Sequence, residues 1–274
     1  MRSNRHARRV EFWLLEGKND IRAPSGIRSG LYHPETAGLG RRDAAVGLFA
    51  TIELMARNDW DEYSAVYLEK MGSNGDYCNR ELILPALLAL CGDDLAGKRV
   101  LDLACGHAQP TVALAQRGAN VVGVDFSKLL LREAQRRVRQ QNVSAGFALA
   151  DAAALPFAPG TFDLIVSNMA LDAIAYARAV LAEAARVARP GAPFVSSFRH
   201  PWTDGWAKNY LDNQVLRIPV QIEWRGKTSS RHYPPRYHRP LSHYVNALYD
   251  AGFTLVACNE VVSGEELLAG QRRK

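Results

Sequence analysis

Between residues 82 and 198, short apolar runs alternate with longer amphipathic segments, and this alternation is what most limits the folds open to the chain. The apolar runs are nearly continuous and are bounded by turn residues, as in strands that are buried on both faces of a sheet. The amphipathic segments have the length of helices that connect parallel strands. We therefore predict an α/β fold, a doubly wound and mostly parallel sheet with helices on both faces.

The same patterns give the expected elements. Strands are predicted at 99–105, 120–125, 147–151, 162–168, 193–198 and 253–262, and helices at 82–90, 111–117, 128–140, 178–188 and 242–250. Residues 200–240 interrupt the alternation and are rich in tryptophan, tyrosine and histidine. Strand-like alternation over 214–224 predicts a hairpin there. We expect 200–240 to be an inserted hairpin or lid on the substrate side, after the fifth strand.

Residues 1–54 lack helical or strand periodicity, and arginines crowd their beginning. Two interpretations stay open. The segment is either an N-terminal arm, disordered or loosely held over the active site, or sequence upstream of a natural start at Met55 that carries no fold. We assign residues 55–274 to one domain, with 200–240 as its substrate-side insert.

The chain has 274 residues, 47% of them hydrophobic, and no apolar run approaches the about 20 residues that cross a bilayer. We therefore expect no membrane contact. The four cysteines have the spacing of neither a disulfide framework nor a zinc site, which fits a reducing compartment, so we expect a cytoplasmic location and no metal. The net charge of +6 suits acidic partners in general but does not by itself indicate nucleic acid.

Three residues mark the ligand end of the predicted sheet: Asp102 in the first strand, Gly106 in the turn after it, and Asp125 at the end of the second strand. Ligands of such sheets bind beyond the carboxyl ends of the strands, where an acid in the position of Asp125 can bind ribose hydroxyls. Ala108 and Thr111 replace two glycines of the dinucleotide fingerprint, and no P-loop is present. The carboxylate of Asp102 would attract a cation and repel a phosphate. The pattern favours S-adenosylmethionine, which has an adenosyl group and a positive charge but no phosphate.

Four segments, at 101–106, 125, 151–157 and 162–171, resemble in order the motifs of class I S-adenosylmethionine-dependent methyltransferases, particularly the small-molecule group of the methyltransferase type 11 kind. The stretch 237–253 is similar to one that many of these enzymes carry after the substrate insert. The resemblance covers roughly residues 55–262 and implies a Rossmann-like fold, with S-adenosylhomocysteine as the product of the cofactor. It implies that Asp125 binds the ribose and Asp151 the adenine amino group. The cofactor-binding residues it implies are Tyr63, Tyr67, Asp102, Ala104, Gly106, Gln109, Asp125, Phe126, Asp151, Ala152, Asn168 and Met169.

The sequence departs from this family pattern at three places. Ala108 replaces the second glycine of the first motif, which we expect to add one methyl group beside the cofactor. Asp172 stands where relatives often have histidine. Only residues 264–274 remain for the usual last strand, so the sheet either stops at six strands or borrows an edge from the insert.

For the substrate, we predict contacts with Asp172, Arg199, Trp202, Trp206 and Tyr237. Aromatic side chains suit a mostly apolar pocket. The basic residues of the insert either face solvent or bind a carboxylate. A small molecule that is aromatic or carries a carboxylate therefore fits best.

A general base is needed only if the methyl acceptor carries a proton with a high pKa. The candidate bases are then His107, His200 and His238.

Three functions remain open. The first is methyl transfer from S-adenosylmethionine to O or N of a small metabolite, with specialised metabolism as one setting. The second is methylation of tRNA or another macromolecule, for which basic and aromatic residues would bind phosphates and bases. The third is a scaffold or regulator with this fold but without methyl transfer. The oligomeric state, monomer or dimer, is left open.

Overall fold

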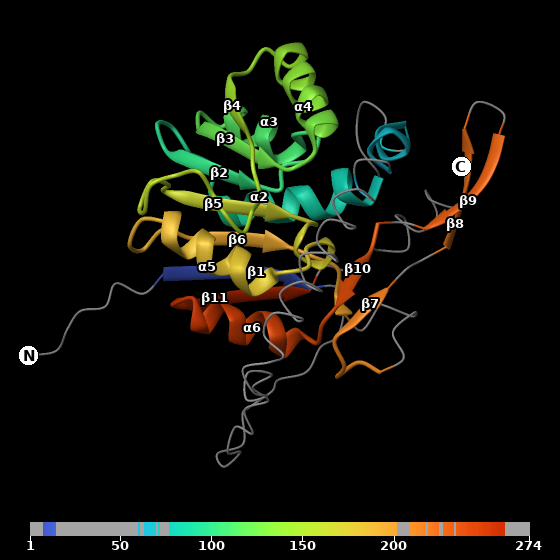
Figure 1. Cartoon of the computed structure of the whole chain (residues 1–274). Coiled ribbons are helices and arrows are strands. Elements are labelled where there is room, and N and C mark those ends of the chain that lie inside the picture. The colour runs from blue at the N-terminus through green and yellow to red at the C-terminus, as the bar shows by residue number, and fades with distance from the viewer. Residues whose placement is uncertain are drawn as a thin grey trace, which may run out of the picture.

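The computed structural model describes residues 8–14, 60, 63–69, 71, 77–201, 209–216, 219–224, 227–232 and 234–260. Its centre is a seven-stranded sheet in the order β11-β1-β6-β5-β2-β3-β4 (Figure 1). Every pairing in this sheet is parallel. The strands are β1 (Arg8–Leu14), β2 (Arg99–Leu103), β3 (Asn120–Asp125), β4 (Ala145–Leu149), β5 (Leu164–Asn168), β6 (Phe194–Ser197) and β11 (Phe253–Glu260).

Helices cover both faces of the sheet (Figure 1). The helices α2, α3 and α4 pack on strands β2 to β6 from one side, and α5 and α6 pack on each other and on β11 from the opposite side. The helices are η1 (Asn79–Ile83), α2 (Leu84–Cys91), α3 (Gln109–Gln116), α4 (Lys128–Gln140), η2 (Leu171–Ala173), α5 (Ala177–Val187) and α6 (Leu241–Asp250). The segment η1 is a π-helix and η2 a 3-10 helix.

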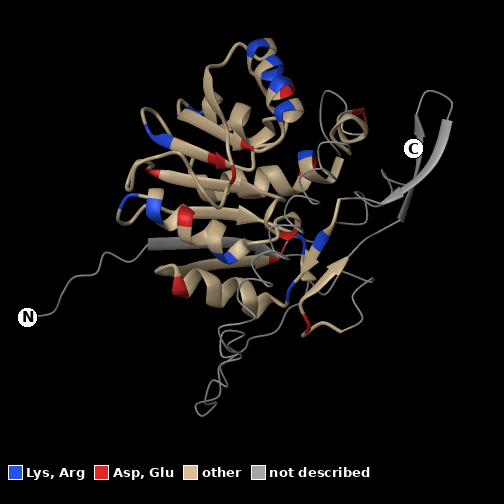
Figure 2. Ribbon diagram, in the orientation of Figure 1, with Lys and Arg blue, Asp and Glu red and all other residues tan. Residues whose placement is uncertain are grey.

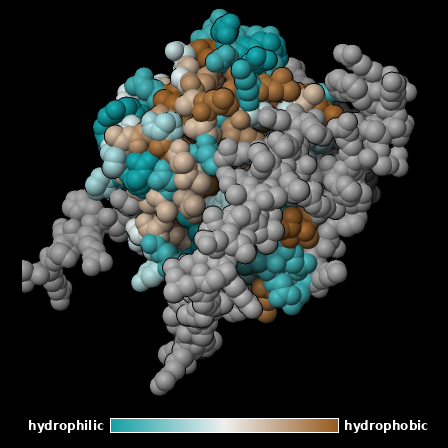
Figure 3. All heavy atoms as spheres, viewed as in Figure 1, coloured by the Kyte–Doolittle hydropathy of each residue, from teal (hydrophilic) through white to brown (hydrophobic). Residues whose placement is uncertain are grey.

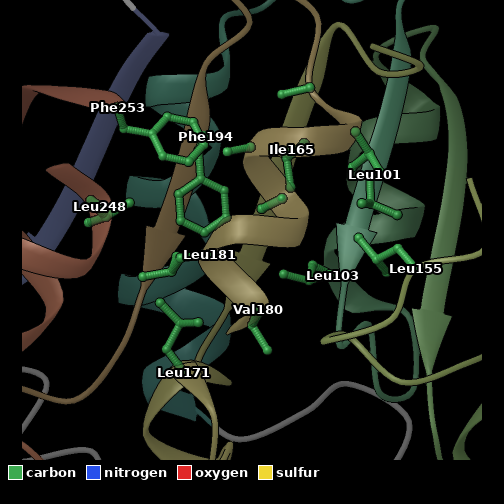
Figure 4. Packing of buried hydrophobic residues seen from close by; sticks show 14 of the residues in the cluster. Leu101, Leu103, Leu155, Ile165, Leu171, Val180, Leu181, Phe194, Leu248 and Phe253 are labelled. Carbon is green, nitrogen blue, oxygen red and sulfur yellow. The ribbon is translucent and has the colours of Figure 1, made fainter. Parts of the chain in front are cut away.

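Alternate residues of the buried strands supply two separate hydrophobic cores. Leu101 and Ile165 pack with α5 and α6, whereas Val100 and Val166 pack with α2. Figure 4 shows the first of these cores, with Phe194 and Phe253 at one end. Because successive strand side chains point to opposite faces, a strand with apolar residues at every position is covered on both sides.

The predicted α/β sheet is confirmed, and several bounds agree closely. Strand β3 and helix α4 have the predicted bounds, and the other predicted strands and helices of the sheet begin and end within a few residues of the expected positions. The last helix begins one residue earlier than predicted, because α6 starts at Leu241 with Pro240 as its N-cap.

Strand β1 is the main difference from the sequence prediction, which placed no strand in residues 1–54. It lies between β6 and β11 and pairs with both (Figure 1). Within the described residues, the sheet therefore has seven strands, and none of them comes from the insert. A segment from the beginning of the chain separates β11 from β6 instead.

The insert contains two small antiparallel pairs. Strand β7 (Gln214–Leu216) pairs with β10 (Arg236–His238), and β8 (Pro219–Trp224) pairs with β9 (Lys227–His232). The hairpin predicted over 214–224 thus lies further along the chain, between β8 and β9. The role of the insert as a lid stays a prediction.

Helix α4 carries a cluster of exposed basic residues, Lys128, Arg132, Arg136 and Arg139. Its basic residues alternate with apolar ones that face the sheet, and Ser127 caps its first turn by accepting a hydrogen bond from the backbone of Leu130. Figure 2 shows this helix marked mainly by Lys and Arg, and Figure 3 shows a hydrophilic surface over it. None of the described helices is long and apolar enough to cross a membrane.

We predict that residues 8–14 are needed for stability. Deleting residues 1–14 removes the strand that pairs with both β6 and β11, and each unpaired backbone group that this leaves buried costs free energy. The melting temperature should fall markedly in differential scanning fluorimetry. Deleting residues 1–7 is the matched control and should leave it within a few degrees. Equal melting temperatures for the two truncated proteins would contradict the pairing.

Candidate functional site

The loop between β2 and α3 turns sharply at the carboxyl end of the sheet. Ala104, Gly106 and Ala108 all have left-handed backbone conformations, with φ of 56°, 53° and 68°. Glycine adopts this conformation without strain, while alanine does so at some cost. The backbone N–H of Cys105 donates to the carbonyl of Val124, which ties the loop to strand β3.

The methyl group of Ala108 lies between two helices. Ala108 is fully buried and packs with Val112, Ala134 and Val138 of α3 and α4. It does not line the pocket described below. The methyl group expected beside the cofactor stays a prediction.

A pocket opens at the carboxyl ends of β2, β3 and β4. Two carboxylates, Asp125 and Asp151, lie among mostly apolar neighbours. The lining residues are Trp60, Ala104, Val124, Asp125, Phe126, Ala150, Asp151, Ala152, Ala153, Ala173, Ile174, Ala175 and Tyr176. Five of the predicted cofactor residues are among them: Ala104, Asp125, Phe126, Asp151 and Ala152.

Asp125 is held by two backbone groups. Its Oδ2 accepts from the N–H of Gly106 at 2.9 Å, and its Oδ1 accepts from the N–H of Ser127 at 2.9 Å. The carboxylate thus connects the loop after β2 to the first turn of α4. Each carboxylate oxygen can accept a second bond, so this arrangement leaves acceptor capacity toward the pocket. Asp151 is similar, since its Oδ1 accepts from the N–H of Ala153 at 2.8 Å.

Asp102 lies beneath the loop and does not line the pocket. It is fully buried, and its Oδ2 accepts from the hydroxyl of Thr111 at 2.5 Å. Its Oδ1 has no hydrogen-bond partner among the described residues. Burial raises the pKa of Asp102 to about 7, although the hydrogen bond from Thr111 acts in the opposite direction. The carboxyl is therefore near its titration midpoint at neutral pH.

Residues 60 and 63–69 bring an aromatic cluster, Trp60, Tyr63 and Tyr67, over the pocket. The ring centroids of Trp60 lie 6.1 Å from Tyr63 and 5.9 Å from Tyr67. Trp60 lines the pocket, while the two predicted tyrosines pack behind it. The hydroxyl of Ser64 lies 3.2 Å from that of Ser127, which fixes this helical segment to the start of α4.

The three candidate bases lie in different surroundings. His107 is buried against the aromatic cluster, with its Nδ1 3.4 Å from the hydroxyl of Tyr67. Its Nε2 has no hydrogen-bond partner among the described residues. Burial, assisted by the charge of Arg137, lowers the pKa of His107 to about 4, so the imidazole is neutral at pH 7.

The other two candidate bases, His200 and His238, have different neighbours. His200 is 3.6 Å from the carboxylate of Glu260, and the Nε2 of His238 lies 3.0 Å from the carbonyl of Tyr210.

Three of the remaining predicted cofactor residues belong to a polar chain at the ends of β5 and β6. Asn79 of η1 donates to the side chain of Gln109 at 2.6 Å and accepts from Asn168 at 3.0 Å. Ser197 donates to Asn168 at 2.6 Å and accepts from the N–H of Met169 at 3.1 Å. None of these residues lines the pocket. They support the loop after β2 from the side of β5.

The predicted substrate residues are dispersed. Asp172 is buried, and its carboxylate lies 3.4 Å from the guanidinium of Arg236. Tyr237 is buried beneath the guanidinium of Arg239, and Arg199 is exposed. Trp202 and Trp206 fall outside the described residues. The substrate contacts therefore stay predictions. Among the described side chains, no three His, Cys, Asp or Glu come together as a metal site would require.

Sequence reasoning missed one wall of the pocket and the tryptophan over it. Ile174, Ala175 and Tyr176 form that wall, in the connection between η2 and α5. The residues carry no polar motif, so only their position after the fourth predicted strand could have indicated them. Trp60 belongs to none of the motifs in the sequence analysis, so nothing in the sequence marked it as a pocket residue.

Comparisons with known proteins agree with this geometry. Residues 100–191 match the family described as "Methyltransferase domain". A demethylmenaquinone methyltransferase of Renibacterium salmoninarum is 36% identical over 142 residues, which are 52% of this chain and 56% of that protein. An uncharacterized methyltransferase of Synechocystis is 41% identical over 100 residues, which are 36% of this chain and 45% of that protein. The chain thus spans about half the length of these relatives.

Among solved structures, the PH0226 protein from Pyrococcus horikoshii has a similar fold, with a TM-score of 0.52 and 23% identity. The similarity covers 69% of this chain and 88% of that one. Residues 100–191 thus match a methyltransferase domain in sequence, and the chain shares its fold with a solved structure.

The raised pKa of Asp102 predicts a measurable effect of pH on stability. Between the ordinary pKa of 3.8 and about 7, the folded protein retains a proton that the unfolded chain has released. Stability that depends on this group therefore falls as the pH rises through this range. Asp102→Asn keeps a neutral group at this position, so the stability of the variant relative to the parent should increase from pH 4 to pH 7.

Urea unfolding of both proteins at pH 5 and pH 8 checks this. The depressed pKa of His107 also makes stability depend on pH, but it is present in both proteins and cancels in the difference. A difference that is the same at both pH values would contradict an Asp102 that is protonated in the folded state.

Proposed function

We propose that this protein transfers the methyl group of S-adenosylmethionine to an oxygen or nitrogen atom of a small metabolite. The observation that carries the proposal is a pocket that combines Asp125 and Asp151 with the tight loop of Ala104. Carboxylates at both positions suit hydroxyl and amino donors and disfavour phosphates. The class of the domain and the relatives named demethylmenaquinone methyltransferases support a small-molecule substrate.

The residues present fit this cofactor. Asp125 would accept from the ribose hydroxyls, and Asp151 with Ala152 would bind the adenine. Ala104 and the aromatic cluster would surround the methionine end. The unsatisfied Oδ1 of Asp102 is an acceptor of the kind that a nearby ammonium group would satisfy. When bound, S-adenosylmethionine supplies a methyl group on a sulfonium leaving group.

The protein's own contribution to such a displacement is mostly positioning. The loop and the strand-end acids would fix one reactant, while Trp60 and its neighbours exclude water from the pocket. Of the three candidate bases, His107 contacts the aromatic cluster that reaches the pocket, although its pKa of about 4 makes it a weak base. An acceptor that is already a carboxylate would need no base. Arg199 and the basic residues of the insert would then orient it.

The first prediction concerns the acceptor. Incubation with methyl-labelled S-adenosylmethionine and fractionated cell extract should place the label in a molecule of low mass. Heat-inactivated protein serves as the control. Label that appears in RNA or protein would contradict the proposed substrate class, and the absence of label from every fraction would contradict methyl transfer.

The second prediction concerns Asp125. Replacing it by asparagine weakens the acceptor for the ribose and for the N–H groups of Gly106 and Ser127. We expect the affinity for S-adenosylmethionine in calorimetry to fall at least about tenfold. Asp94→Asn is the control. Asp94 is exposed and precedes the amino end of β2, whereas the pocket lies at the carboxyl ends of the strands. Its carboxylate accepts from the N–H of Ala96. Unchanged affinity in Asp125→Asn would refute the ribose assignment.

A further inference from the structure

Arg239 is a buried cation that none of the roles above uses. It follows strand β10, and its side chain is only 6% exposed. One nitrogen of its guanidinium, Nη2, donates to the carbonyls of Ile174 at 2.7 Å and Ala175 at 2.6 Å. Both acceptors belong to the wall of the pocket. A residue more than 60 positions further along the chain thus holds this wall by direct hydrogen bonds.

The surroundings of Arg239 keep its guanidinium in one place. It lies over the ring of Tyr237, 5.1 Å from the centroid, and 6.0 Å from that of Tyr244. Its other nitrogen, Nη1, is 3.4 Å from the carbonyl of Leu171. A buried charge is tolerated only when hydrogen bonds compensate its lost hydration. Here the compensation comes mainly from backbone carbonyls of one short segment.

That segment has little regular structure to fix it. It connects the three-residue helix η2 to α5, whose N-cap Tyr176 makes no capping hydrogen bond with its side chain. The segment forms a wall of the same pocket that Ala104 lines. Its position therefore depends on side chains that reach it from elsewhere.

A second arginine of the same stretch supports the arrangement. Arg236, in β10, lies 3.4 Å from the carboxylate of Asp172, which belongs to η2. The residues 236–239 thus hold η2 and the wall at two points, one through a carboxylate and one through carbonyls. Since β10 belongs to the insert and pairs there with β7, this also connects the pocket wall to the insert.

We propose that Arg239 is a positioning residue that holds the Ile174–Ala175 wall in the form that accepts the cofactor. The inference rests on the proposed function, because it concerns the same pocket. Lysine at this position keeps the charge but not the planar, multiply donating guanidinium. The wall then loses at least one of its two short hydrogen bonds, and the pocket is less well formed before the ligand enters.

The test compares Arg239→Lys with the parent protein by titration calorimetry with S-adenosylmethionine. We expect the dissociation constant to rise about tenfold at unchanged stoichiometry. A purely structural role would instead unfold part of the sample, which lowers the stoichiometry and leaves the dissociation constant of the folded fraction unchanged. Arg178→Lys is the matched control, since Arg178 is an exposed arginine of α5 paired with Asp250. The affinity of this variant for S-adenosylmethionine should equal that of the parent.

The outcomes separate the two proposals. A parent protein that binds no S-adenosylmethionine contradicts the proposed function. A parent that binds it and an Arg239→Lys variant with the same dissociation constant overturn only the role of Arg239. If Arg239→Lys does not fold, the affinity of the milder variant Asp172→Asn tests the inference instead, because this variant weakens the ion pair that also holds η2. We expect an about threefold weaker affinity there, and parental affinity in that variant would overturn the inference.

Discussion

The hydrogen bond between the carboxylate of Asp125 and the backbone of Gly106 is the constraint on which the pocket depends. It joins the ends of two neighbouring parallel strands, and the second oxygen of the same carboxylate fixes the start of α4. The left-handed conformations at 104, 106 and 108 make this approach sterically feasible. One side chain therefore shapes the loop, orients a helix and still has acceptor capacity toward the pocket.

Much of this could be predicted because it is local. Strands β2, β3, β5 and β6 each contain consecutive apolar residues, and α4 has a polar face, an apolar face and a capping serine. Parallel strands then bring their carboxyl ends to one edge. The family resemblance implied Ala104, Asp125, Phe126, Asp151 and Ala152 at these strand ends, and all five line one pocket.

What could not be predicted depends on contacts between distant segments. Strand β1 has no clear periodicity of its own and is defined by its pairing with β6 and β11. The wall at Ile174 and Ala175 is apolar and carries no motif, while the arginine that holds it lies in another part of the chain. The methyl group of Ala108 points into a helix interface because of the backbone conformation at that residue, which the sequence does not reveal.

We propose that this pocket takes a phosphate-free, cationic adenosyl compound. A crystal of the protein soaked with S-adenosylmethionine is the sharpest test. We expect density for the compound in the pocket, with both ribose hydroxyls within hydrogen-bond distance of Asp125 and the adenine beside Asp151. Density for the compound at any other place, or a pocket that stays empty at saturating concentration, would overturn the proposal.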